Sequence, residues 1–156
     1  MSVVQRVLQV IGAVWTSPNT MAGLVIGLVA LARGARASVS DGAVVFCRVP
    51  FGPGGALTLG NVILHTGAGM DDTALTYACR AHGGNDCVRI GDHERAHVYQ
   101  YLVLGPLFLP LYFFYGGISA GNRFERAADI YALSGRGWWP WSARAKSGPS
   151  ARPRVP

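Results

Sequence analysis

The chain has 156 residues, of which 50% are hydrophobic and only 14% are charged. That is long enough for one domain with a single core, but an average soluble domain has about 25% charged residues, so the composition favours partial burial in lipid. The net charge of +6 belongs mainly to the last 24 residues, which carry five basic residues and no acid. Because no basic stripe is interleaved with aromatic residues, we expect anionic lipid and no nucleic acid as the partner.

Residues 1–36 are predicted to form an apolar, membrane-associated segment. Residues 7–32 carry no charge, and such a run exceeds the roughly 20 residues that a helix needs to cross a bilayer. Ser17 and Pro18 suit the N-cap and first turn of a helix, which we expect to continue to Arg33. Because this helix is slightly short for a straight span, tilted insertion, a re-entrant pair and a buried core helix stay open. A cleaved signal peptide is the competing interpretation, although the arginines after the run favour a cytoplasmic flank.

Residues 37–133 are predicted to form one small domain of the α+β class. Residues 43–47 and 56–64 are rich in β-forming residues and are separated by a glycine- and proline-rich turn, which predicts a hairpin or a small sheet. The spacing of apolar residues over 71–80 is compatible with a helix. The nearby Cys79 and Cys87 match no C-x-x-C spacing, so free thiols and a disulfide both stay open.

The following residues predict two helices that flank a second apolar run. Asp92 is the expected N-cap of a helix that ends before Gly105. The uncharged residues 98–122 contain two prolines, which favours a short helix in or against the membrane over a straight span. A last helix is expected over residues 123–133. Residues 134–156 are basic and contain three tryptophans, which predicts a disordered tail with an aromatic anchor at the membrane surface.

The sequence His93-Glu94-Arg95-Ala96-His97 is the motif that carries chemistry. Two imidazoles four residues apart lie on one face of a helix, where both can bind one zinc ion. Glu94 lies to one side of them, which suits a general base that deprotonates water. Glu125 is the candidate third ligand, and Asp129 lies one helical turn further on, where it can orient a ligand histidine.

The composition strengthens this interpretation, because Glu94 and Glu125 are the only two glutamates of the chain. The alternative is a helix whose His93 and His97 face solvent or the core, with Glu125 paired to a neighbouring arginine. Both glutamates fall at the positions that this chemistry requires, Glu94 as the base and Glu125 as the ligand.

These residues resemble the motifs of zinc metallopeptidases with a glutamate as third ligand, the gluzincins. Residues 125–129 (Glu-Arg-Ala-Ala-Asp) are similar to the E-x-x-A-D signature of membrane-embedded heat-shock peptidases of the HtpX type. Residues 93–110 also resemble small uncharacterised bacterial proteins with H-E-x-x-H-x-x-Q followed by G-P-L. The resemblance, which covers residues 93–132, implies a zincin-like domain in which His93, His97 and Glu125 bind Zn²⁺. It further implies Glu94 as the base and Asp129 as an outer partner.

The predicted function is therefore hydrolysis of a peptide or protein substrate at a membrane, which we expect to be the bacterial inner membrane. A membrane-anchored metal-binding or interaction protein that cleaves nothing is the alternative. Peptidases of this class also use an edge strand and an oxyanion donor. Residues 61–64 are a candidate for the edge strand, and Tyr112, Tyr131 and His65 are candidates for the donor, with a surface histidine at a strand end as the alternative for His65.

Overall fold

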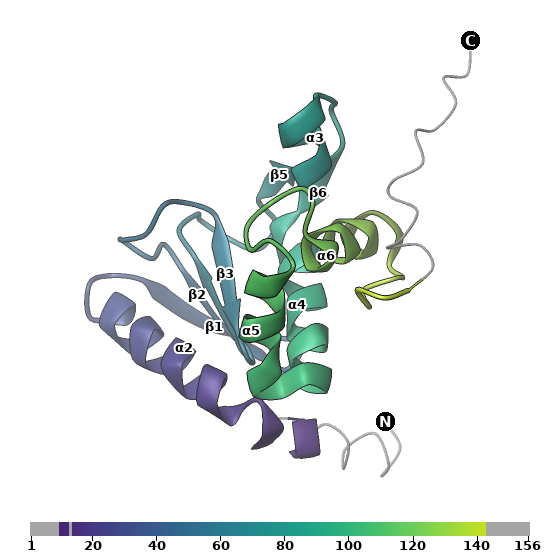
Figure 1. The fold of residues 1–156 in the computed structure, drawn as a ribbon. Helices are drawn as coiled ribbons and strands as arrows, with labels where there is room; N and C mark the ends of the chain where they lie inside the picture. The colour runs from purple at the N-terminus through teal and green to yellow at the C-terminus, as the bar shows by residue number, and fades with distance from the viewer. Residues whose placement is uncertain (1–9, 13, 143–156) are drawn as a thin grey trace.

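The computed structural model describes residues 10–12 and 14–142 (Figure 1). It is a mixed α+β structure, which confirms the predicted class. A four-stranded sheet has α2 on one face and α4 on the other, while a two-stranded sheet and α3 lie beside the start of α4. The elements are α2 (Ser17–Leu31), β1 (Arg36–Ser40), β2 (Ala43–Cys47), β3 (Ala56–Leu59), β4 (Val62–His65), β5 (Thr73–Leu75), α3 (Tyr77–His82), β6 (Cys87–Arg89), α4 (Ile90–Leu104), the 3-10 turn η1 (Gly105–Leu107), α5 (Phe108–Phe114) and α6 (Arg123–Ser134).

The large sheet has the strand order β1-β2-β4-β3, with two antiparallel hairpins joined through the parallel pair β2 and β4. The run 56–64 is two strands and not one, because the chain turns at Gly60, whose φ of 61° suits glycine. Strand β4 is therefore internal, and the predicted edge strand over residues 61–64 is wrong. The edge strands are β1 and β3, and β3 is the one that packs beside α4. The hairpin β1–β2 turns at Asp41 and Gly42, a dipeptide typical of tight hairpin turns.

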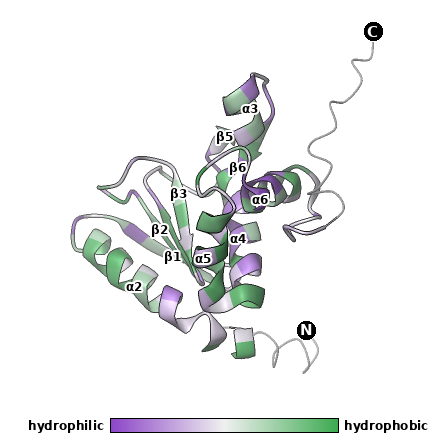
Figure 2. Ribbon diagram, in the orientation of Figure 1, coloured by the Kyte–Doolittle hydropathy of each residue, from purple (hydrophilic) through white to green (hydrophobic). Residues whose placement is uncertain are grey.

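Helix α2 has Pro18 in its first turn, as predicted, but its N-cap is Thr16 and not Ser17, and it ends at Leu31, two residues before the predicted end. It lies so close to the sheet that a Cβ atom at Gly27 would overlap the Phe46 ring. Its buried residues are small, whereas large apolar side chains such as Leu28 point outward. Figure 2 shows that most of α2 is apolar. Leu24 and Ile26 are half-buried against the sheet, so α2 packs through one face and leaves its other large apolar side chains exposed.

Helices α4 and α5 follow one another through the 3-10 turn η1, where the chain reverses its direction. The run Ile90–Phe114 is, among the described residues, the one helix long and apolar enough to cross a membrane, a test that core helices also pass. The Phe108 ring stacks on Tyr101 at 3.9 Å, and the Tyr112 ring lies 6.3 Å from His97. The chain therefore folds back at η1, as its glycine and proline suggest, and α4 packs as a core helix.

Other segments differ from the predicted ones in detail. The run 71–80 is strand β5 followed by α3, whose N-cap Thr76 accepts a hydrogen bond from the Cys79 amide. Helix α4 starts at Ile90, directly after β6, so Asp92 lies in its first turn and is not the N-cap. Helix α6 begins at Arg123, as predicted, and ends at Ser134, one residue past the predicted end; the structure shows Asn122 as its N-cap.

The tail is packed at its start. Trp141 lies 5.6 Å from Phe124 and Trp138 lies 5.7 Å from Tyr99, measured between ring centroids. These tryptophans extend the aromatic core around α4 and α6, so the folded part continues past residue 134. The rest of the predicted tail, residues 143–156, lies outside the described residues.

Candidate metal centre

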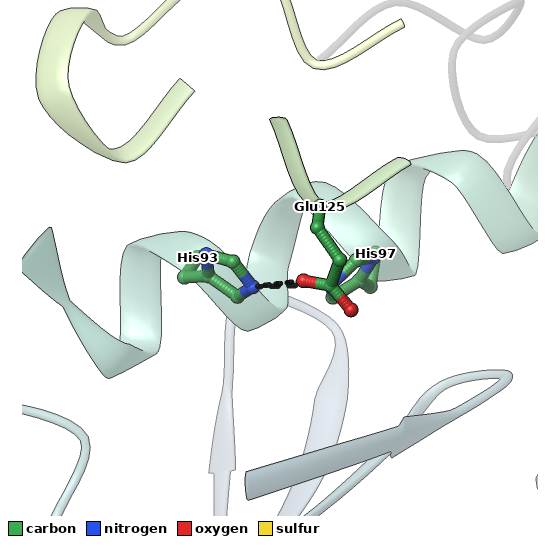
Figure 3. A group of neighbouring side chains, drawn as sticks. All are labelled: His93, His97 and Glu125. Carbon is green, nitrogen blue, oxygen red and sulfur yellow. Dashed lines mark hydrogen bonds and ion pairs between the residues drawn. The ribbon is translucent and has the colours of Figure 1, made fainter. Parts of the chain in front are cut away.

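Three side chains converge between α4 and α6 (Figure 3). Because α4 is helical, His93 and His97 project from the same face, and α6 packs against that face and contributes Glu125. The His93 Nε2 atom lies 3.0 Å from Glu125 Oε2 and 3.2 Å from His97 Nε2, and His97 Nε2 lies 3.4 Å from the same carboxylate oxygen. All three residues are buried. The cluster could hold a metal ion.

Each of the three candidate ligands has an outer hydrogen-bond partner. Nδ1 of His93 lies 3.0 Å from Asp129 Oδ1, and Nδ1 of His97 lies 2.8 Å from Gln100 Oε1. Because both partners accept at Nδ1, the hydrogen atoms sit there and both Nε2 atoms face the centre. The Tyr112 hydroxyl donates to the second oxygen of Glu125. The sequence predicted the role of Asp129, whereas Gln100 and Tyr112 were not recognised as holding the ligands.

The outer partners are themselves fixed by backbone groups. The second oxygen of Asp129 accepts from the Tyr77 amide at the start of α3, over 2.8 Å. The amide nitrogen of Gln100 donates to the carbonyl of Trp138 over 2.8 Å and to that of Phe124 over 3.3 Å. The ligands are therefore anchored to α3 on one side and to the folded start of the tail on the other.

The electrostatics of the cluster favour a cation at its centre. Burial favours the neutral form of His93, but its hydrogen bonds with Asp129 and Glu125 outweigh this effect and raise its pKa to about 10. Burial likewise opposes the charge of His97, and Glu125 raises its pKa. Burial alone would raise the pKa of Glu125, but the two imidazoles hold this pKa well below its usual range. These shifts favour protonated imidazoles, so a metal ion that bound between the three residues would displace protons.

The spacing of the three inner atoms fits a zinc ion. Ligands at about 2.0–2.1 Å from a tetrahedral zinc lie about 3.3 Å from one another, and the observed separations are 3.0, 3.2 and 3.4 Å. With both Nδ1 atoms protonated, two nitrogen lone pairs and a carboxylate oxygen face each other. That arrangement is repulsive unless a proton or a metal ion lies between them.

Glu94 lies beside this centre and is held by the edge strand. The hydroxyl of Thr58 on β3 donates to Glu94 Oε2 over 2.7 Å, and both side chains are buried. Among the described residues no hydrogen bond is recorded for the other carboxylate oxygen. Thr58 is a third residue whose role could not be predicted, because nothing in the sequence indicates that β3 crosses α4 at this point.

A cleft leads to the centre from the surface. Its volume is about 460 Å³, and His93 and Asp129 form part of its lining. The edge strand β3 and the loop before it form one wall, and β5 and α3 form the other. The ring of Tyr77, which also lines the cleft, lies 5.9 Å from the His93 ring. Glu94, His97 and Glu125 do not line the cleft, so it reaches the candidate metal site on the side of His93.

The three candidate oxyanion donors have other roles in the structure. Tyr112 is committed to Glu125, and the Tyr131 ring packs on Tyr99 at 5.7 Å. His65 is buried and not a surface residue: its two ring nitrogens lie 3.0 Å from the Gly55 carbonyl and 2.9 Å from Asp72. His65 therefore ties the loop after β4 to the sheet.

All three cysteines are free thiols, so the disulfide considered between Cys79 and Cys87 is not formed. No protein-family model, curated protein or solved structure matches this chain.

Proposed function

We propose that this chain is a zinc-dependent, membrane-associated peptidase with a zincin-like core. The observation that carries the proposal is the convergence of His93 Nε2, His97 Nε2 and Glu125 Oε2 at 3.0–3.4 Å. Two imidazoles and one carboxylate are a ligand set found in catalytic zinc sites, which keep one position open. The arrangement of a motif helix beneath a sheet, with the third ligand on a later helix, supports the zincin-like assignment.

The buried residues have distinct roles in this proposal. His93, His97 and Glu125 would hold the ion, and Asp129 and Gln100 keep the imidazoles in the required tautomer. When bound, zinc supplies a Lewis acid that polarises a carbonyl group and acidifies water.

Glu94 is the proposed general base. Its carboxylate takes a proton from the attacking water and delivers it to the amine nitrogen that leaves when the C–N bond breaks. Thr58 fixes one oxygen of this carboxylate by its hydrogen bond and leaves the other oxygen for the water molecule.

The surface supports the membrane-associated part of the proposal. Phe113 and Phe114 on α5 are 65% and 80% exposed, and Ile118 in the following loop is 75% exposed. Together with the outward apolar side chains of α2, these residues give the chain apolar surfaces that suit the interfacial region of a bilayer. Neither helix needs to cross the membrane for this contact.

A structural zinc site is the second candidate, and the burial of the ligands favours it. His93, His97 and Glu125 are 7%, 6% and 3% exposed, and structural zinc sites are closed to solvent. In that case the ion would stabilise the contact between α4 and α6, and no peptide would be cleaved.

The Glu94→Gln variant separates the two candidates. Wild type and variant, both loaded with zinc, are assayed on a mixture of unstructured peptides, with hydrolysis followed by mass spectrometry. A peptidase loses turnover in this variant but keeps its zinc and its melting temperature, because Glu94 is proposed to contact water and not the metal. Equal hydrolysis by both proteins, or none by the wild type, would contradict the catalytic proposal. Arg36→Gln, a substitution at an exposed position on β1, controls for activity that is lost during purification and zinc loading.

A further inference from the structure

The cleft beside the candidate metal centre has an apolar wall on each side. Leu57 on β3 and Leu75 on β5 line it, as do Ile118 and the loop over residues 51–55. Its volume of about 460 Å³ lies within the range of sites that bury a ligand of several hundred daltons. Leu57 is 49% exposed, so this apolar surface is open to a ligand from solvent.

The exposed side chain of Arg80 places one positive charge in this apolar lining. Apart from the site residue His93, Arg80 is the only basic side chain that lines the cleft among the described residues. Its guanidinium lies over the Tyr77 ring, 5.4 Å from the centroid. No ion pair between Arg80 and a carboxylate is found within the described part of the chain. The acid nearest to it in the lining, Asp129, uses its two oxygens for His93 and the Tyr77 amide.

The position of Arg80 fixes how far its partner would lie from the metal centre. Both groups lie against the Tyr77 ring, the His93 ring at 5.9 Å and the guanidinium at 5.4 Å from its centroid, which limits the distance between them. An extended chain advances about 3.3 Å per residue, so Arg80 lies within about three or four substrate residues of the metal centre. The outer edge of β3 is not paired with any described strand, so a substrate strand can add to it in an extended conformation.

We propose that this cleft binds an extended apolar peptide whose carboxylate group, about three residues from the scissile bond, pairs with Arg80. The inference rests on the proposed peptidase function and specifies its substrate. The apolar side chains of the peptide are buried between β3 and β5, which provides affinity. The ion pair with Arg80 fixes the position of the peptide along the cleft. The carboxylate belongs either to an acidic side chain or to the C-terminus of the substrate.

Three fluorescein-labelled peptides of about eight residues, mainly leucine, valine and threonine, provide the test. The first has a free C-terminal carboxylate, the second has an internal glutamate and an amidated end, and the third has glutamine and an amidated end. Binding is measured by fluorescence anisotropy at low salt, with zinc-loaded Glu94→Gln protein so that no peptide is consumed. We expect one carboxylate peptide to bind about two- to fivefold more tightly than the neutral one, as for an exposed ion pair.

Three variants in the same background separate the contribution of the Arg80 charge from effects on folding and on the apolar wall. Arg80→Gln should abolish the preference for the carboxylate and leave the affinity for the neutral peptide unchanged, while Arg36→Gln should change neither. Leu57→Asn, at a half-exposed position on β3, should weaken all three peptides. A preference for the first peptide assigns the C-terminus, and a preference for the second assigns an acidic side chain.

Other outcomes overturn the inference. They are equal binding of all three peptides, a preference that survives in Arg80→Gln, or no binding to the protein. Hydrolysis by the wild-type protein is scored separately. If the Arg80-dependent preference is found but the zinc-loaded wild type cleaves no peptide, the proposed catalysis fails and the cleft assignment stands. If peptides are cleaved without regard to a carboxylate, the reverse holds.

Discussion

Replacement of Gln100 by methionine removes three hydrogen bonds at once without changing the length of the side chain. The Gln100 side chain is fully buried. Its oxygen lies 2.8 Å from His97 Nδ1, and its nitrogen donates to the carbonyls of Trp138 and Phe124 over 2.8 and 3.3 Å. Gln100→Met therefore leaves one N–H group and two carbonyl groups buried without these partners. It also removes the hydrogen bond that fixes the tautomer of His97.

The size of the effect follows from these contacts. Each lost hydrogen bond contributes about 1 kcal/mol net, so we expect the free energy of unfolding to fall by about 3 kcal/mol. For a chain of this size that corresponds to a decrease in melting temperature of about 6–12 °C. Loss of an outer partner of a metal ligand weakens the metal affinity by about 10- to 100-fold. Calorimetry of the metal-free protein measures the first effect, and competition with a chromogenic chelator measures the second.

Gln100→Glu is the matched control. A glutamate still accepts from His97 Nδ1 but cannot donate to the two carbonyls. This variant should therefore have a lower melting temperature than the wild type but bind zinc more tightly than Gln100→Met. If Gln100→Met keeps both the melting temperature and the zinc affinity of the wild type, the anchoring role assigned to this side chain is refuted.

Three further predictions concern other parts of the chain. Asp129→Ala should weaken zinc by about 10- to 100-fold in the same chelator competition; unchanged affinity would contradict its role. The hydrogen bond with His65 lowers the pKa of Asp72, so this pair adds stability that is present above pH 3.8 and is lost as the pH falls below it. The melting temperature of Asp72→Asn should therefore be reduced near neutral pH and should approach the wild-type value in acid; a constant difference would count against the pair. Replacing Phe113 and Phe114 by serine should reduce co-flotation of the protein with anionic vesicles. Undiminished flotation would show that these residues do not form the membrane contact.

The elements nearest the candidate site were the easiest to predict from the sequence. Helix α6 has a capping asparagine before it and a glycine in the left-handed conformation after it, and these are local signals. The spacing of His93 and His97 is also a local property of a helix. Their meeting with Glu125 was predictable because the motif residues are rare in this composition.

Contacts between distant segments were not predictable in this way. Thr58 and Gln100 act through hydrogen bonds to Glu94 and His97, and the Thr58 contact depends on β3 being the edge strand. That position follows from the parallel pairing of β2 with β4, for which a single sequence gives no register signal. The apolar run after α4 was similarly ambiguous, because a helix that folds back on the core and one that enters lipid have the same composition.

The central claim is that His93, His97 and Glu125 bind zinc together. The direct test is the zinc content of the purified chain after dialysis, measured by inductively coupled plasma mass spectrometry. The wild type and the exposed control variant His82→Ala should each hold about one zinc ion per chain. The His93→Ala, His97→Ala double variant and Glu125→Ala should hold much less. Zinc in the wild type no higher than in the double variant would contradict the metal centre, and full occupancy in Glu125→Ala would remove this residue from it.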